Sequence, residues 1–323
     1  MKMALRYRSA PTKLIIFFVV IIGIYGVCEI YRRHDYQSDF IRLKGRLLST
    51  KETLLYHRST DSLVQIQLEN DNGIGVDGYL RIPSSTDGPH PALIILGGLG
   101  TGKRVLDYIE NTDGLVLLAL DYPYRGKTRK LRWWEFLANL PGMRKAVVNT
   151  PPAVMLCVDY LEARRDIDRS RIILIGGSLG ALFVPAIAAA DPRISGVALL
   201  FGAGDLQSLL RANIRLPEPI ASIVSWIGAI LVSPVEPLKY IDRISPRPLF
   251  MLNGTGDTRM PSRCSRLLYD KAGPPKTIVW IPAEHLHVSS NKFHDLVRKE
   301  LEAWLVQNKI LSSDLAGAQH LPE

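Results

Sequence analysis

The sequence predicts an α/β fold built around a mostly parallel β-sheet, and two observations carry this prediction. First, continuous apolar runs recur along the chain, as expected for parallel strands that are covered on both faces. These runs occupy residues 92–96, 115–120, 171–175, 197–201, 248–252 and 277–281. Second, a glycine-flanked serine in the motif Gly176-Gly177-Ser178-Leu179-Gly180 separates one run from an apolar segment that begins a helix.

Flanking elements complete the predicted domain. Residues 63–68 alternate apolar and polar side chains, which predicts a strand, and residues 75–82 are its expected antiparallel partner. Pro151 predicts the start of a helix that continues to Arg164, because proline is tolerated in a first helical turn. Apolar residues at helical spacing predict a closing helix. They are Phe293, Leu296, Val297, Leu301, Trp304 and Leu305.

The serine motif predicts a nucleophile elbow. A sharp strand-to-helix turn lifts the Ser178 hydroxyl above the carboxyl end of the sheet. The flanking glycines remove Cβ atoms that would collide with the neighbouring strand and helix. The alternative is a glycine-rich turn in which Ser178 caps the helix.

A serine nucleophile needs a base to take its proton and a carboxylate to orient that base. Asp257 lies in the loop after the run 248–252, and His285 follows the run 277–281 by a short loop. We favour His285 as the base because it lies nearer the strand end, but His287 competes with it. Asp257 could instead be an ordinary turn residue.

The ordered set Ser178, Asp257, His285 resembles the α/β-hydrolase superfamily, and most of all its dienelactone-hydrolase and acyl-esterase-like members. The turn at residues 121–126 is similar to the one after the family's fourth strand, and residues 166–171 resemble the lead-in to its elbow. The resemblance implies an α/β-hydrolase domain at residues 61–311, with a mostly parallel eight-stranded sheet flanked by helices.

The resemblance also implies an oxyanion hole formed by two backbone N–H groups. In the family one comes from the residue after the nucleophile and the other from the loop after the third strand. These positions match Leu179 and Leu99. Gly97 stands where the family usually has a histidine, which leaves open how this loop is held.

Two other chemistries are weaker alternatives. His285 and His287 form a His-x-His pair that could bind zinc, but no further His or Cys cluster lies nearby in the sequence. Residues 97–103 satisfy the spacing of a phosphate-binding loop, yet Arg104 stands where Ser or Thr would bind magnesium. We therefore expect neither a metal nor an organic cofactor.

The N-terminal region predicts a membrane segment. Residues 14–28 are uncharged and apolar, between a basic segment at 1–13 and a polar connector at 29–60. Of the formal net charge of +9, residues 1–46 hold nine Lys and Arg against three acids, or +6, which leaves +3 beyond. This distribution suits anionic headgroups better than nucleic acid. A cleaved signal peptide is the alternative to an anchor.

A single-pass anchor would place the catalytic domain outside a bacterial cytoplasm, although the charges flanking residues 14–28 determine orientation only weakly. The sequon at Asn253 lies beside the expected acid, where a glycan would crowd the site, and this weighs against a eukaryotic secretory lumen. Cys28, Cys157 and Cys264 are scattered and indicate no disulfide framework.

Two insertions lie outside the minimal fold. Residues 206–244 occupy the place of a lid in the family, and their apolar stretch 220–232 could line an acyl pocket, touch a membrane surface or pack inside the domain. Residues 127–145 mix six basic residues with three aromatic ones, which suits either an interfacial helix or a helix packed inward. Residues 312–323 are expected to be a disordered tail.

These patterns together predict a serine hydrolase that cleaves a carboxylic ester or thioester. Alternatives are a peptidase or amidase on the same fold, or a membrane-tethered binding module without catalysis.

Overall fold

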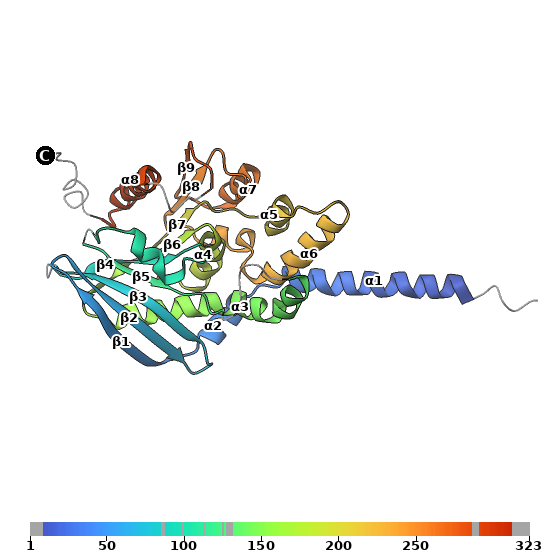
Figure 1. Ribbon diagram of the computed structural model, residues 1–323, viewed down its shortest axis with the longest axis horizontal. Coiled ribbons are helices and arrows are strands. Elements are labelled where there is room, and N and C mark those ends of the chain that lie inside the picture. The colour runs from blue at the N-terminus through green and yellow to red at the C-terminus, as the bar shows by residue number, and fades with distance from the viewer. Residues whose placement is uncertain are drawn as a thin grey trace, which may run out of the picture.

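A mixed β-sheet forms the centre of the protein (Figure 1). The computed structural model describes residues 9–84, 88–98, 100–112, 114–124, 126, 132–285 and 291–311. Within them, nine strands pair in the order β1-β2-β3-β5-β4-β6-β7-β8-β9. The strands are β1 (Leu47–His57), β2 (Asp61–Asn70), β3 (Gly75–Pro83), β4 (His90–Leu96), β5 (Val116–Leu120), β6 (Ile167–Gly177), β7 (Gly196–Leu200), β8 (Leu249–Gly254) and β9 (Lys276–Ile281).

The strand directions divide the sheet into two parts. β1, β2, β3 and β5 pair antiparallel in that order, whereas the pairs from β5 through β4, β6, β7 and β8 to β9 are parallel. The parallel part matches the apolar runs of the sequence. All carboxyl ends of these parallel strands lie at one edge, where the loops that follow β6, β8 and β9 come together.

The prediction of eight strands was wrong by one, because β1 occupies part of the expected connector. Its side chains are mostly exposed and show no alternation of burial. β1 joins the sheet through its backbone pairing with β2 at the sheet's edge, so the period-2 signal of a half-buried strand is missing.

Helices cover both faces of the sheet. The described helices are α1 (Ser9–Arg33), which projects away from the sheet, α2 (Gln37–Lys44), α3 (Trp133–Ala163), α4 (Leu179–Ala190), α5 (Leu206–Asn213), α6 (Ile220–Val232), α7 (Ser262–Lys271) and α8 (Asn291–Gln307), with 3₁₀ helices η1 (Gly102–Tyr108), η2 (Ser233–Val235), η3 (Pro237–Lys239) and η4 (Ile241–Arg243). Residues of α2, α3 and α4 share one apolar core with the sheet, and residues of η1 and α8 share the other.

The helix expected from Pro151 to Arg164 is the second half of a longer helix. α3 begins at Trp133, and the backbone N–H of Arg132 donates to the Glu135 carboxylate at 2.8 Å in its first turn. Pro151 therefore lies inside the helix rather than at its start. Proline is compatible with a first turn but does not require one, and here the helix continues through it at the cost of one backbone hydrogen bond.

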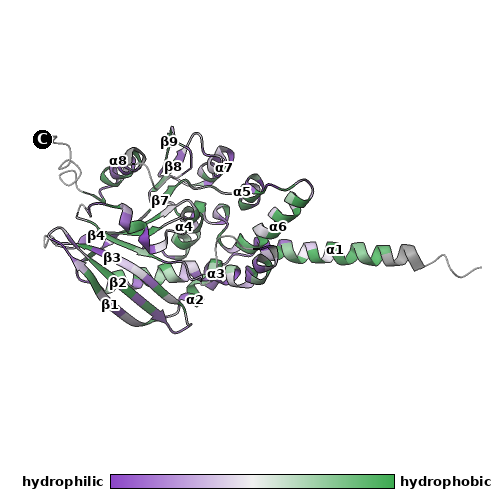
Figure 2. Ribbon diagram, viewed as in Figure 1, coloured by the Kyte–Doolittle hydropathy of each residue, from purple (hydrophilic) through white to green (hydrophobic). Residues whose placement is uncertain are grey.

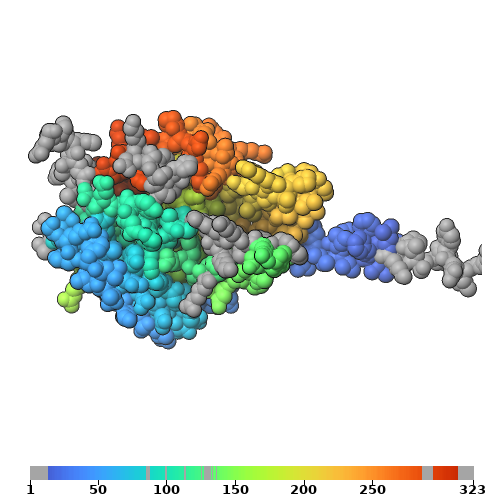
Figure 3. Space-filling model, in the orientation of Figure 1, coloured from blue at the N-terminus to red at the C-terminus, as the bar shows by residue number. Residues whose placement is uncertain are grey.

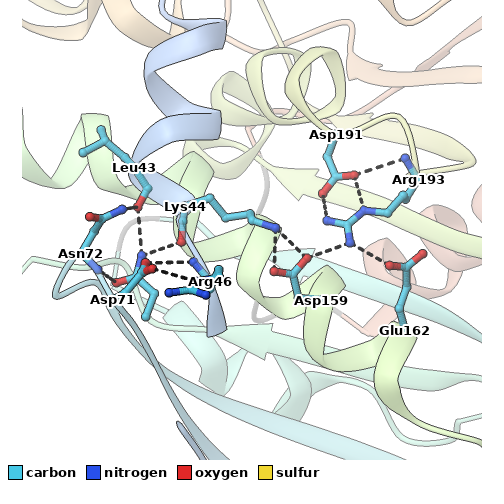
Figure 4. Close-up of polar contacts among 10 residues, drawn as sticks. Leu43, Lys44, Arg46, Asp71, Asn72, Asp159, Glu162, Asp191 and Arg193 are labelled. Carbon is cyan, nitrogen blue, oxygen red and sulfur yellow. Dashed lines mark hydrogen bonds and ion pairs between the residues drawn. The ribbon is translucent and has the colours of Figure 1, made fainter. Parts of the chain in front are cut away.

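The connector predicted at residues 29–60 contains a docked helix. α2 buries Phe40 completely, and Lys44 at its end donates to Asp159 of α3 at 2.7 Å. Figure 4 shows that the Asp159 carboxylate also accepts a hydrogen bond from Arg193, which follows α4. Arg193 in turn contacts Glu162 of α3 at 2.7 Å. This network ties α2 to the two helices that cover one face of the sheet.

The N-terminal helix leaves the body of the protein (Figure 1). Within the described residues, the one helix long and apolar enough to cross a membrane is the stretch Leu14–Arg33 of α1. The apolar side chains of this stretch are exposed, with Ile22 at 67% and Val27 at 67%. An N-terminal signal sequence would meet the same criteria of length and composition.

Candidate active site

Ser178 lies at the turn between β6 and α4, as the motif predicted. Its backbone adopts φ 53° and ψ −109°, a conformation that non-glycine residues rarely take. Such a conformation costs of order 1–3 kcal/mol and persists only where its surroundings enforce it. The Ser178 N–H donates to the Leu200 carbonyl of β7 at 2.8 Å, and its carbonyl accepts from Ala181 at 3.1 Å.

The flanking glycines are required by close backbone packing. A Cβ on Gly180 would lie 2.1 Å from the carbonyl oxygen of Leu96 in β4. A Cβ on Gly176 would lie 2.5 Å from the carbonyl carbon of Gly180. Both distances are far below van der Waals contact, so the strand, turn and helix can pack this way only with glycine at these positions.

Three predicted residues meet at the carboxyl edge of the sheet. Ser178 Oγ lies 2.8 Å from His285 Nε2, and His285 Nδ1 lies 2.8 Å from Asp257 Oδ2. Asp257 comes from the loop after β8, and His285 from the loop after β9. His285 and Asp257 are both buried, with 9% of each residue exposed. His287 lies outside the described residues, so its position relative to Ser178 stays undescribed.

The Asp257 carboxylate is held in its ionised form. Burial alone would raise its pKa, but the hydrogen bond with His285 and the backbone N–H groups of Met260 and Arg259 outweigh burial and lower it. Those N–H groups donate to Oδ1 at 2.9 and 2.8 Å, which leaves Oδ2 for the imidazole. A fixed carboxylate of this kind orients a histidine and stabilises the imidazolium.

The loop after β4 lies beside Ser178. A Cβ built on Gly98 would come within 3.9 Å of the Ser178 Cβ. Leu99, predicted as one oxyanion donor, lies outside the described residues. Leu179, predicted as the other, is the first residue of α4. The N–H groups of a helix's first turn have no partner within the helix and point outward, as an oxyanion donor must.

Tyr122 helps to hold this loop. Its hydroxyl donates to the Gly97 carbonyl at 2.6 Å, and its ring packs against Phe183 of α4. Burial raises the pKa of the Tyr122 phenol, so the hydroxyl stays a donor at neutral pH. Thr101 adds a hydrogen bond from its hydroxyl to the Gly98 carbonyl at 2.9 Å.

Sequence reasoning missed Tyr122 and Phe201 as parts of the site. The Phe201 ring meets the His285 ring edge to face, with centroids 5.7 Å apart. Phe201 ends an apolar run, and nothing in that run distinguishes it from a buried strand residue. Tyr122 lies within the turn at residues 121–126 that resembled the family, so its position after β5 was the available signal.

The lysine of the phosphate-loop pattern has a structural role. Lys103 Nζ lies 2.6 Å from Asp77 Oδ1 and 3.3 Å from Asp121 Oδ2, and it sits over the Tyr79 ring. The Asp121 carboxylate also accepts from the Lys103 backbone N–H at 3.0 Å. A nucleotide phosphate would have to displace two carboxylates from Lys103, which disfavours the nucleotide-binding alternative.

The described residues contain no group of three or more His, Cys, Asp or Glu side chains that could hold an ion, and His287 lies outside these residues. Asn253 of the sequon is buried, and its amide donates to the Gly202 carbonyl and the Ser265 hydroxyl at 3.0 Å each. In the folded protein this side chain is therefore inaccessible to a glycan-transferring enzyme.

Comparison with known proteins finds relatives that match most of the chain in sequence. No protein-family model matches the chain. The uncharacterized protein YfhR of Escherichia coli (strain K12) is 22% identical over 302 residues, which cover 91% of this chain and 94% of YfhR. The putative hydrolase YtaP of Bacillus subtilis (strain 168) is 26% identical over 256 residues, covering 71% of this chain and 83% of YtaP.

A solved structure has a similar fold. An acetyl xylan esterase from Paenibacillus sp. R4 superposes with a TM-score of 0.65 over 83% of this chain and 93% of its own, at 17% identity. The chain therefore has the α/β-hydrolase fold, and the predicted resemblance to esterase-like members of that superfamily is confirmed at the level of the fold.

Proposed function

We propose that the protein is a serine hydrolase that cleaves a carboxylic ester or thioester through an acyl-enzyme. The observation that carries this proposal is the continuous series of 2.8 Å hydrogen bonds from Ser178 through His285 to Asp257. A binding module without catalysis has no need of a strained serine aligned with a base and a buried carboxylate.

In the first half-reaction, Ser178 Oγ attacks the carbonyl carbon of the substrate while His285 Nε2 takes the hydroxyl proton. Asp257 accepts the Nδ1–H bond and stabilises the imidazolium. The backbone N–H groups of Leu179 and Leu99 donate hydrogen bonds to the negatively charged tetrahedral oxygen and stabilise it. When the intermediate collapses, the imidazolium gives its proton to the leaving alcohol or thiol, and the acyl group stays on Ser178.

In the second half-reaction, His285 takes a proton from water as the water oxygen attacks the acyl-enzyme. The second tetrahedral intermediate releases the carboxylic acid, and the proton on His285 returns to Ser178 Oγ. The cycle returns Ser178 and His285 to their starting protonation states, and the proposed steps use these residues, the substrate and water.

The test is labelling of the purified full chain with a fluorophosphonate probe, which reacts with activated serines. We expect labelling of the native protein, none of Ser178→Ala, and matching circular dichroism of the two. Hydrolysis of p-nitrophenyl esters should disappear with labelling. Equal turnover by the folded Ser178→Ala protein would refute the assignment, and preference for p-nitroanilides over esters would identify an amidase instead.

We further propose that α1 is an uncleaved, single-pass anchor with the catalytic domain outside a bacterial cytoplasm. A residue that cleavage after Cys28 would remove packs against the domain: the Tyr25 ring of α1 stacks on Trp226 of α6, with centroids 5.5 Å apart. A signal peptide that is removed has no need of such a contact. N-terminal sequencing of membrane-derived protein should find Met1 or residues close to it, and a start just after Cys28 would contradict the anchor.

A further inference from the structure

The outer face of α6 is apolar although it is exposed. Large aliphatic residues recur on that face at i, i+3, i+4 and i+7, whereas the opposite face buries small side chains. The exposed residues are Ile220, Ile223, Val224 and Ile227, and the buried ones are Ala221, Ser225 and Ala229. Packing within the chain is thus achieved by the small residues and does not explain the large ones.

The first turns of α3 also expose apolar side chains to solvent. Trp134, Leu137, Ala138 and Pro141 are exposed at the same helical spacing. Leu137 is 52% exposed, as much as Ile223 of α6 at 54%. We call Ile220, Ile223, Val224 and Ile227 of α6 together with Trp134 and Leu137 of α3 the apolar rim. Figure 2 shows α6 and α1 as adjoining apolar helices.

Both helices that carry the apolar rim contact the base of α1. The Tyr25 ring of α1 stacks on Trp226 of α6, with centroids 5.5 Å apart. On the other side, the Arg144 guanidinium of α3 lies 5.0 Å from the centre of the Tyr31 ring. Figure 3 shows the surfaces of α6, yellow-orange, and of the start of α3, green, on either side of the α1 base.

The contacts of α1 indicate the level of α6 relative to a bilayer. Glu29, Arg32 and Arg33 belong with the headgroups, because charges at the end of a span lie outside the hydrocarbon. Tyr25 lies one turn before Glu29, at the interface that Tyr and Trp prefer. Because Trp226 stacks on Tyr25, α6 lies at the same level, with Ile223 and Ile227 within a turn of Trp226.

The rim also belongs to the catalytic edge of the sheet. The chain leaves β7 at its carboxyl end and enters α5 and α6, and it leaves β5 at its carboxyl end before α3 begins. Ser178 follows the carboxyl end of β6 between them. Insertions that carry the rim and loops that carry the proposed triad therefore start from one edge of one sheet.

We propose that the apolar rim seats in the leaflet from which α1 emerges, so that the catalytic edge faces the bilayer and the substrate is a membrane-borne acyl ester. Exposed cations suited to anionic headgroups lie beside the rim and on α1: Arg132 lies over the Trp134 ring at 5.2 Å, and the Arg33 side chain is 81% exposed. The choice of substrate rests on the proposed esterase function, whereas the seating of the rim does not.

The seating is tested with full-length protein in phosphatidylcholine vesicles that contain phosphatidylglycerol. Cys28 is changed to serine, and Ile227→Cys or Leu267→Cys is labelled with an environment-sensitive fluorophore. Leu267 of α7 is 43% exposed, close to the 47% of Ile227, but lies outside the rim. We expect blue-shifted emission and quenching by doxyl-labelled lipid at Ile227 but not at Leu267. Equal emission at both sites, or a blue shift at Ile227 without lipid quenching, would overturn the seating; the latter would assign the rim to a second copy or another protein.

The substrate is tested with a double variant, Ile223→Gln with Ile227→Gln, against the matched control Leu267→Gln. Hydrolysis of a vesicle-borne long-chain ester should fall about tenfold in the double variant, while hydrolysis of soluble p-nitrophenyl acetate stays within about twofold. The control should change neither. An equal loss on both substrates would overturn the substrate proposal. A native protein that cleaves neither ester would instead refute the esterase function and leave the quenching result to stand.

Discussion

The nucleophile elbow and the junction between α1 and α6 are held together by different kinds of contact. At the elbow, backbone lies against backbone, so that a single added Cβ on Gly180 would reach 2.1 Å from a carbonyl oxygen. At the junction, side chains meet across 197 positions of sequence, as Trp226 does with Glu29. The elbow therefore tolerates no added atom, whereas the junction can lose a side chain and keep its backbone.

We infer that this difference separates a rigid site, the proposed catalytic one, from an adjustable attachment, the proposed membrane anchor. A nucleophile must be held within a fraction of an ångström of its base, and backbone packing supplies that precision. A membrane attachment has to accommodate lipids of varying thickness and composition, which side-chain contacts at an interface permit. The elbow lies between β6 and α4, and the junction lies between α1 and α6. Because they consist of different residues, each can be perturbed while the other is measured.

The largest expected effect is on catalysis at the elbow. His285→Ala should lower kcat/KM for a p-nitrophenyl ester by about 10⁴-fold, because Ser178 loses its base. His287→Ala should keep substantial activity if the base has been chosen correctly. Steady-state kinetics on both purified variants decides between them, and the reverse pattern would move the base to His287. Loss of activity on chelation with restoration by zinc would reopen the metal alternative.

The next effect tests whether the segment after the junction belongs to the fold. Removing residues 1–34 deletes α1 but keeps α2, whereas removing residues 1–46 also deletes Phe40 and its buried contacts. Because loss of a buried phenylalanine costs about 3–5 kcal/mol, the shorter chain should be less stable by at least about 3 kcal/mol. Urea unfolding in mild detergent measures the difference. Equal midpoints would show that residues 35–46 are a passive connector after all.

A third prediction compares glycines of the two regions directly. Gly180→Ala should destabilise the full chain by about 3 kcal/mol, because the new methyl group meets backbone that cannot move aside. Gly26→Ala on α1 places its methyl in open space, with no atom within 4 Å, and alanine favours a helix by about 1 kcal/mol over glycine. Thermal unfolding in detergent should separate the two. A Gly180→Ala protein with native stability would contradict the packing argument.

The same contrast explains what the sequence could predict. The elbow is local: the apolar run, the two glycines and the helix start lie within about a dozen residues, so the motif predicted the turn. Asp257 and His285 were predicted because each follows an apolar run, and parallel strands bring such ends to one edge. The catalytic assignment of these residues, and of Leu99 and Leu179, stays a proposal that the experiments above test.

The features that the sequence did not predict depend on contacts between distant segments. β1 pairs at a sheet edge with exposed side chains, so it has no periodic apolar pattern. The docking of α2 rests on Lys44 meeting Asp159, 115 positions away, and a lone surface lysine gives no sign of its partner. The sequence predicted one helix within residues 127–145 and another from Pro151, whereas the structure has a single helix, α3, with Pro151 inside it. The Tyr122 hydroxyl donates to the Gly97 carbonyl, 25 positions away, and this contact forms only when the two loops meet in the folded protein.

The smallest expected effect lies at the junction itself. Trp226→Leu removes the stack on Tyr25 and the hydrogen bond to Glu29 but leaves the backbone of α6 unchanged. An aromatic pair and a partly exposed hydrogen bond together are worth about 1 kcal/mol, which corresponds to roughly fivefold more frequent opening of the α1 base. Trypsin cleavage at the exposed Arg33 should accelerate by that factor in vesicle-bound protein, since cleavage follows the open population. Hydrolysis of a soluble ester should stay unchanged, because Trp226 belongs to the junction and not to the elbow. If cleavage keeps its native rate, α1 is held by the membrane alone. If ester hydrolysis falls as well, the attachment and the chemical site are coupled, and the separation drawn between them is wrong.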